Sequence, residues 1–278
     1  MAYFTSNTYT LKRKILSFTN KISKHLSKPE KKFAADITYG MLASESCLLT
    51  DVVDQLHESS KKVNIVDRLS RHLDKGTPAP AAASYLQQVK RMVPAEPVIH
   101  IDDSDVVKPN GYKFEALGIV RDGSESTATK SVYKKGCHVT EACALTASNH
   151  PVSIFSHIHS SQEKDYKSAN TITFHAIEQG AALFGKATFA MDRGYDDNKM
   201  FLKLDELGQD YVIRLTKKRK LLYHNKWTMA AELCKRRKGK VKTSVFYKGK
   251  EHEAYLSHVK VQITASKKDI YLVLVYGI

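Results

Sequence analysis

Hydrophobic residues recur every three or four positions over roughly the first third of the chain, which predicts helices there. The first run consists of Leu11, Ile15, Phe18, Ile22 and Leu26. Lys and Arg stand between these positions, so we expect an amphipathic basic helix that ends near Pro29. A second helix is expected over residues 32–44.

Two shorter helical patterns follow, at 48–56 and 63–73, with a break at 58–62. Two short helices around a tight turn, with Arg68 and Arg71 on one side of the second, suit a helix-turn-helix that reads DNA. A plain helical bundle with solvated charges is the alternative. Proline-rich sequence at 76–80, and Pro94 with Pro97, predict that this helical region spans 1–95.

After residue 95 the pattern changes to alternating or continuous apolar stretches. The expected strands are 98–102, 113–120, 137–147 and 151–158, followed by a helix over 166–183, a short strand ahead of Asp192, a helix over 198–207 and a strand at 211–215. This order predicts an α/β, ribonuclease H-like mixed sheet with helices on both faces over residues 96–215.

The last part of the chain, 216–278, is strongly basic and predicts a β-rich module. Between Val212 and Lys268 there are seventeen Lys or Arg against three Glu, a surplus of fourteen positive charges. Strands are expected at 242–247, 253–263 and 269–276. This concentration of positive charge favours a surface that binds along the phosphates of a nucleic acid, rather than a charged face that contacts only solvent.

The overall composition also favours a polyanionic partner. With 278 residues, 42% of them hydrophobic, the chain is long enough for one large domain or two ordinary ones. A net charge of +15 and a pI near 9.5 favour a polyanionic partner, although ribosomal and membrane-surface proteins share this bias. Four scattered cysteines without zinc-finger spacing, no secretion signal and no apolar run of membrane-spanning length predict a soluble, cytoplasmic protein with reduced thiols.

Two apolar stretches run directly into an acid, Ile101-Asp102 and Met191-Asp192. Two divalent cations about 4 Å apart activate the attacking oxygen and neutralise the leaving oxygen of a phosphodiester, and carboxylates on neighbouring strands are suited to hold them. Asp103 or Asp105 could replace Asp102 as the first ligand, and spacing does not decide between them. An Asp after a strand is also a common turn residue.

These segments resemble the catalytic core of DDE transposases, and the insertion-sequence-four group in particular. The similarity is carried by 101–109 (IDDSDVVKP), 117–123 (LGIVRDG), 136–139 (GCHV) and 191–195 (MDRGY), with weaker similarity at 32–46 and 67–71.

The resemblance implies a ribonuclease H-like transposase with a β-rich insertion, in which Asp102 and Asp192 are the first two catalytic acids on two Mg²⁺ or Mn²⁺ ions. Arg193 and Tyr195 belong to the motif of the second acid. Further DNA contacts are expected from the helical region and the insertion, at Arg68, Arg71, Lys217, Lys218, Arg219, Lys220, Arg236 and Arg237. The implied partners are double-stranded DNA (element ends and target) and a second copy of the chain, near the bacterial nucleoid.

The sequence departs from this family at the third acid. Tyr211 and Arg214 begin the expected Tyr, Arg, Glu, Lys spacing, but Lys218 stands where the Glu belongs. We expect that the chain ends inside the insertion, ahead of that Glu. A non-catalytic DNA-binding remnant is therefore the alternative function, and a nuclease of the same fold acting on RNA is a third.

Other candidate sites are weaker. His150, His157 and His159 with Asp165 suggest a metal site, but alternating His on a strand is more often packed or at the surface. Ser104 lacks the glycine-flanked elbow of a nucleophile and is expected to be a turn or capping residue. Glycine-rich phosphate loops are absent from the sequence.

Overall fold

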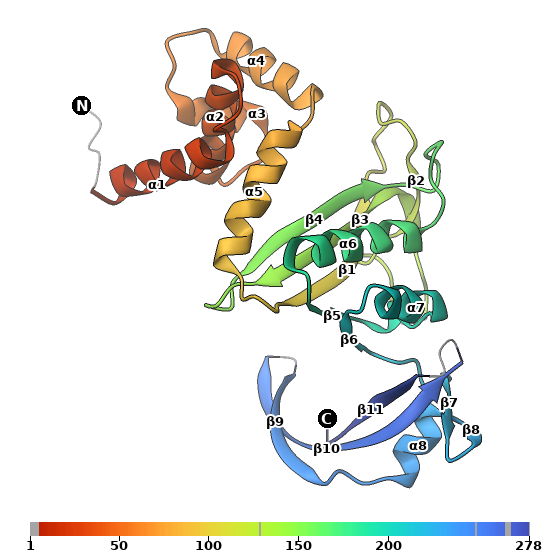
Figure 1. Cartoon of the computed structure of the whole chain (residues 1–278). Helices are drawn as coiled ribbons and strands as arrows, with labels where there is room; N and C mark the ends of the chain where they lie inside the picture. Colours follow the sequence, from red (N-terminus) through yellow and green to blue (C-terminus); the bar gives the residue numbers. More distant parts are fainter. Residues whose placement is uncertain (1–5, 128, 248, 265–267, 278) are drawn as a thin grey trace. The chain divides into compact units, whose positions relative to one another are not determined.

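The computed structural model describes residues 6–127, 129–247, 249–264 and 268–277. It divides into two compact units, Met1–Met92 and Val93–Ile278, which have separate hydrophobic cores (Figure 1). In the part of the chain that is described, no helix is long and apolar enough to cross a membrane.

The first unit is helical, as the sequence predicts. Its helices are α1 (Ser6–Ile22), α2 (Lys28–Ser44), α3 (Leu49–Leu56), α4 (Lys62–Asp74) and α5 (Ala79–Met92). The start of α2 is fixed by a capping box, in which the backbone N–H of Ser27 donates to the Glu30 carboxylate at 2.8 Å. A Cβ on Gly40 would lie 2.5 Å from Val52, so glycine allows α2 and α3 to approach closely.

The short helix pair predicted at 48–56 and 63–73 is confirmed as α3 and α4. Their buried side chains Val52, Val53, Ile65 and Leu69 form the core of the unit. Helix α5 was not predicted, because Pro78 and Pro80 suggested an interruption. Proline is compatible with the first turn of a helix, where backbone N–H groups have no intrahelical acceptor.

The second unit begins with a mixed six-stranded sheet. Its strands are β1 (Val98–Val107), β2 (Gly118–Arg121), β3 (Tyr133–Leu145), β4 (Pro151–His159), β5 (Thr188–Met191) and β6 (Asp210–Ile213). The order is β2-β3-β1-β5-β6, and β4 also pairs with β3. The first four strands pair antiparallel, whereas β1, β5 and β6 are parallel. The predicted α/β fold with a mixed sheet is confirmed.

Two of the strand predictions need correction. The first strand does not end at Asp102: it continues to Val107 because its antiparallel pairing with β3 extends to the pair Val107 and Gly136. What ends near Asp102 is the parallel pairing with β5, whose last pair is Ile101 and Met191. The strand expected at 113–120 begins only at Gly118, after a segment of turns.

Helices α6 (Ala169–Phe184) and α7 (Asn198–Glu206) flank this sheet (Figure 1). A Cβ on Gly180 of α6 would lie 2.8 Å from Ile99 and 3.1 Å from Phe189, which places α6 tightly against β1 and β5. Phe201 of α7 packs edge-on against Tyr211, which shares the Phe189 face by strand register. Helices were expected on both faces, but these two cover the same face, and His100, Asp102 and Val212 on the opposite face are exposed.

A second sheet completes this unit. It consists of β7 (Lys220–Tyr223), β8 (Lys226–Met229), β9 (Val241–Tyr247), β10 (Lys250–Ile263) and β11 (Asp269–Tyr276), with helix α8 (Ala230–Arg236) between β8 and β9. The order is β11-β10-β7-β8, and β9 also pairs with β10. Its core includes Leu221, Leu233, Val261 and Leu272 together with Phe201 of α7, so α7 contributes to the packing of both sheets. The three predicted strands are confirmed, whereas β7, β8 and α8 were not predicted.

Candidate functional site

Two acids from distant parts of the chain lie next to each other on the open face of the first sheet. Ile101 of β1 pairs with Met191 of β5, and each is followed directly by an aspartate. Both Asp102 and Asp192 are exposed, and both line a pocket of about 1140 Å³. Parallel pairing therefore brings together two carboxylates separated by ninety residues of sequence.

The backbone orients both carboxylates. Asp192 directly follows β5 and caps a short 3-10 turn, Arg193–Tyr195, in which its Oδ1 accepts a hydrogen bond from the Gly194 N–H at 2.5 Å. Asp102 Oδ1 accepts from the backbone N–H of Asp103 at 3.0 Å. Each carboxylate has a second oxygen on which a ligand can bind.

Asp103 faces the other way, and its exposed carboxylate is bound by a buried polar pair, Thr140 and His159. Thr140 Oγ1 donates to Asp103 at 2.6 Å and lies 2.9 Å from Nε2 of His159. Thr140 and His159 are buried, and burial lowers the pKa of His159. Because the Thr140 hydroxyl proton is directed to Asp103, His159 Nε2 is the donor to Thr140. Asp103 is thus held from the face opposite to the pocket.

Asp105 is also held by a partner. Its carboxylate lies 2.7 Å from Nδ1 of His138 on the neighbouring strand β3. Neither Asp103 nor Asp105 lines the pocket that holds the other two acids. Of Asp102, Asp103 and Asp105, Asp102 lines the pocket together with Asp192.

Tyr195 lies among the acids. Its side chain is buried, and its hydroxyl has no hydrogen-bond partner of good geometry in the described part of the chain. Burial first, and then the negative charges of Asp103, Asp102 and Asp192, raise the pKa of Tyr195. The Tyr195 hydroxyl therefore lies near Asp103 as well as near the two acids of the pocket.

The pair of carboxylates suits a hard divalent cation. Mg²⁺ and Mn²⁺ prefer oxygen ligands, and the Asp102 and Asp192 side chains offer them on an accessible surface. Within the described ranges, no group of three or more His, Cys, Asp or Glu is arranged to hold a metal ion. The rings of His157 and His159 are neighbours of one another and of other aromatic side chains, with His159 buried and His157 exposed.

Side chains expected at DNA fall into two groups. Those exposed to solvent are Arg71, Arg193, Lys217, Lys218, Lys220 and Arg236. In contrast, Arg68 is half-buried and binds Asp36 and Glu58 at 2.8 and 2.7 Å. Arg237 donates to the Tyr223 hydroxyl at 3.2 Å. The expected DNA contact does not fit Tyr195 or Arg219, whose polar groups are enclosed by the protein.

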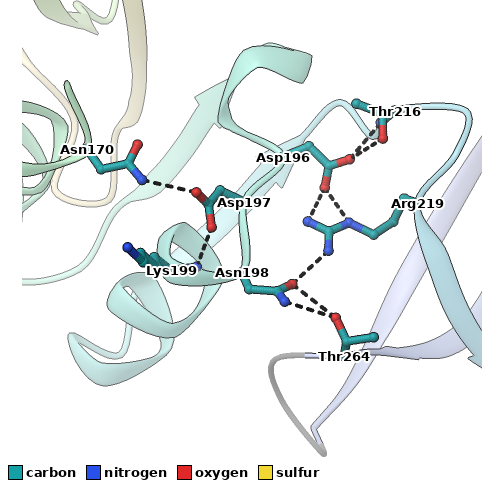
Figure 2. A network of polar contacts seen from close by, with 8 residues as sticks. All are labelled: Asn170, Asp196, Asp197, Asn198, Lys199, Thr216, Arg219 and Thr264. Carbon is teal, nitrogen blue, oxygen red and sulfur yellow. Dashed lines mark hydrogen bonds and ion pairs between the residues drawn. The ribbon is translucent and has the colours of Figure 1, made fainter. Parts of the chain in front are cut away.

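Sequence reasoning missed two polar groups next to the site. One is the chain of Thr140 and His159 behind Asp103. The other is the contact of Asp196 with Arg219, drawn in Figure 2. Alternation along β3 and β4 signals that Thr140 and His159 point inward, but nothing local indicates that they meet.

Comparison with known proteins gives one family. The model described as "Transposase DDE domain" matches residues 95–271, well over half of the chain. No curated protein matches.

Similar solved structures include the Mos1 transposase paired-end complex with the left transposon end and the Mos1 mariner paired-end complex with Mn. They are 11% and 12% identical to this chain, with a TM-score of 0.24 in each case. The match covers 64% of this chain and 57% of the Mos1 chain, less than two thirds of its length. Assignment to a family therefore rests on the family model.

Proposed function

The chain belongs to the transposase DDE domain family, and on this premise we propose that it acts in DNA transposition of the insertion-sequence-four type, with Asp102 and Asp192 as metal ligands. The observation that carries the proposal is the pairing of Ile101 with Met191, which puts the two acids in one pocket. Asp103 is bound from the opposite face, which favours Asp102 as the first acid.

Each part of the site has a role in this chemistry. Two Mg²⁺ or Mn²⁺ ions, when bound, supply an activated water and stabilise the leaving 3′ oxygen. Asp102 and Asp192 hold them, while the N–H groups of Asp103 and Gly194 fix the orientation of the carboxylates. Cleavage at an element end frees a 3′ hydroxyl, which then attacks a target phosphodiester and displaces that strand's 3′ oxygen.

DNA is the proposed partner, bound through its backbone. The exposed Lys217, Lys218 and Lys220 lie in the stretch that supplies almost all of the chain's surplus positive charge. Lys217 and Arg214 also line the pocket of the two acids. Phosphate contacts of this kind position a duplex but do not read its sequence. Action as a homodimer on paired ends is proposed from the family alone.

The test uses isosteric changes of the acids. Asp102→Asn and Asp192→Asn should each lower Mn²⁺-dependent cleavage of an element-end fragment by at least about a thousandfold while end binding persists, because the cation loses a charged ligand. Asp105→Asn is the matched control, since Asp105 lies in the same strand but binds His138 outside the pocket. Unchanged cleavage in Asp192→Asn would refute the assignment.

A non-catalytic DNA-binding remnant is the second candidate. The observation that favours it is Lys218, at the position where the spacing from Tyr211 and Arg214 calls for a Glu. This candidate predicts end binding with no cleavage by the unmodified chain at any Mn²⁺ concentration. Cleavage that depends on Asp192 would exclude it.

A further inference from the structure

The loop that follows Asp192 is joined to the second sheet by a buried polar network (Figure 2). Its centre is Asp196, directly after the 3-10 turn, whose side chain is only 1% exposed. Oδ1 of Asp196 accepts from Arg219 Nε at 2.6 Å and lies 2.5 Å from Nη2, so the arginine binds with two nitrogens. Oδ2 accepts from the backbone N–H and the hydroxyl of Thr216, at 2.8 and 2.9 Å.

Arg219 extends the network on its other side. Its Nη1 donates to Asn198 Oδ1 at 2.7 Å, and Asn198 Nδ2 donates to Thr264 Oγ1 at 3.0 Å. The guanidinium also lies over the ring of Phe201, 5.3 Å from its centroid. Asp196, Asn198 and Phe201 belong to the loop and helix after β5, whereas Arg219 directly precedes β7 and Thr264 directly follows β10.

The neighbouring acid, Asp197, provides an internal contrast. Its carboxylate accepts from the backbone N–H of Lys199 at 2.9 Å and from Asn170 at 3.1 Å. Both partners belong to the helices that cover the first sheet, so Asp197 makes none of the described contacts to the second sheet. Two adjacent carboxylates therefore hold the same loop in different directions.

We propose that Asp196 and Arg219 are positioning residues, which keep the loop carrying Asp192 in a fixed place relative to the basic second sheet, which begins with β7. Only the turn Arg193–Tyr195 separates Asp192 from Asp196. A displacement of Asp196 is therefore expected to move the carboxylate of Asp192, which lies only four residues away along the chain. This inference rests on the proposed function, because it concerns the proposed metal site.

The chemistry of the pair fits such a role. The planar guanidinium of Arg219 directs two of its nitrogens to Oδ1 of Asp196 and a third to Asn198, and lysine, with a single nitrogen, does not reproduce this set of contacts. With both oxygens of Asp196 bound, the carboxylate has little freedom to turn. Mutation of a residue that holds a metal ligand in place typically lowers the metal affinity by about 10–100-fold.

Binding of Tb³⁺, a luminescent hard cation, tests the proposal on the full chain. Tb³⁺ is excited directly, and its luminescence lifetime lengthens when carboxylates displace water from the ion, so the lifetime reports bound Tb³⁺ wherever it is held. Asp196→Asn should weaken Tb³⁺ binding about tenfold or more, and Arg219→Lys should weaken it less. Asp197→Asn, the matched control, should stay within about twofold of the unmodified chain, because asparagine still caps a helix.

The melting temperature of each variant is measured as a control for loss of stability. Asp196→Asn and Asp197→Asn are both expected to lower it, so only the Tb³⁺ affinity separates them. Thr216→Val, which removes one hydroxyl contact to Asp196, serves if Asp196→Asn does not fold by circular dichroism. Unchanged affinity in a folded Asp196→Asn, or in Thr216→Val together with Arg219→Lys, would overturn the positioning role.

Asp192→Asn separates this outcome from failure of the proposed function. If Asp192→Asn loses Tb³⁺ while Asp196→Asn keeps it, the metal site stands and only the positioning role is wrong. If Asp192→Asn binds Tb³⁺ as tightly as the unmodified chain, the proposed metal site itself is wrong and the positioning role falls with it.

Discussion

Replacement of Thr140 by valine tests the buried polar chain behind the site. Thr140 is completely buried, donates to Asp103 at 2.6 Å and lies 2.9 Å from His159. Valine has a similar shape but removes the hydroxyl, so both neighbours lose a partner. A hydrogen bond to a charged group contributes about 1.5–3 kcal/mol, and an unsatisfied buried donor costs about 1–3 kcal/mol. The added buried methyl offsets roughly 1 kcal/mol, which leaves an expected loss of about 1.5–5 kcal/mol.

Urea unfolding followed by Trp227 fluorescence measures this loss, because Trp227 belongs to the same compact unit as Thr140. With an m value of about 2–3 kcal/mol per molar, the midpoint should fall by roughly 1 M at unchanged m. Thr140→Ser keeps the hydroxyl and should lose only about 1 kcal/mol. The partly exposed strand residue Thr243, changed to valine, should shift stability by less than about 0.5 kcal/mol. A Thr140→Val protein as stable as the Thr243→Val control would refute the reasoning.

Three further results are expected. Because burial lowers the pKa of His159, its contribution to the free energy of unfolding is present above the unfolded pKa of about 6.5 and is lost as pH falls below it. The variant His159→Gln should therefore show a flatter dependence of the free energy of unfolding on pH between about pH 7 and 5. An unchanged slope would contradict this expectation. Gly180→Ala should cost about 1–2 kcal/mol in urea unfolding, because its Cβ would lie 2.8 Å from Ile99, and a stabilised variant would show that α6 is not so closely packed. Joint replacement of Lys217, Lys218 and Lys220 by Gln should reduce the slope of log K for DNA binding against log salt concentration by about 2–3. The control Lys134→Gln, whose lysine pairs with Asp122, should leave this slope unchanged. Equal slopes in the triple variant and the unmodified chain would exclude these lysines from the DNA surface.

Local sequence patterns predicted most of the elements because burial repeats with the period of each element. The continuous apolar run at 270–275, for example, corresponds to β11, in which Leu272 and Leu274 are buried on one side. The β7–β8 hairpin was missed because its turn, His224-Asn225, has positive φ at both residues without a glycine. Turns of that geometry are usually recognised by Asn-Gly or Asp-Gly.

The candidate site was predictable only in part, since its two acids follow apolar stretches but their partners are distant in sequence. Asp196 and Arg219 are twenty-three residues apart, and the sequence suggested a DNA contact for Arg219 because it stands in a basic run. Likewise, the extent of β1 beyond Asp102 depends on pairing with β3, which no local pattern specifies. Pairing between distant segments, not the propensity of either one, decides these features.

Mn²⁺ binding by the unmodified chain, the two single variants Asp102→Asn and Asp192→Asn, and their double variant tests the shared cation site most directly. If both carboxylates hold the same ion, each single variant loses most of the affinity and the double variant loses little more, because interacting ligands are not additive. A shared cation site is contradicted if the losses of binding free energy in the two single variants add up in the double variant, as for independent sites. It is also contradicted if Asp103→Asn abolishes Mn²⁺ binding while Asp102→Asn retains it.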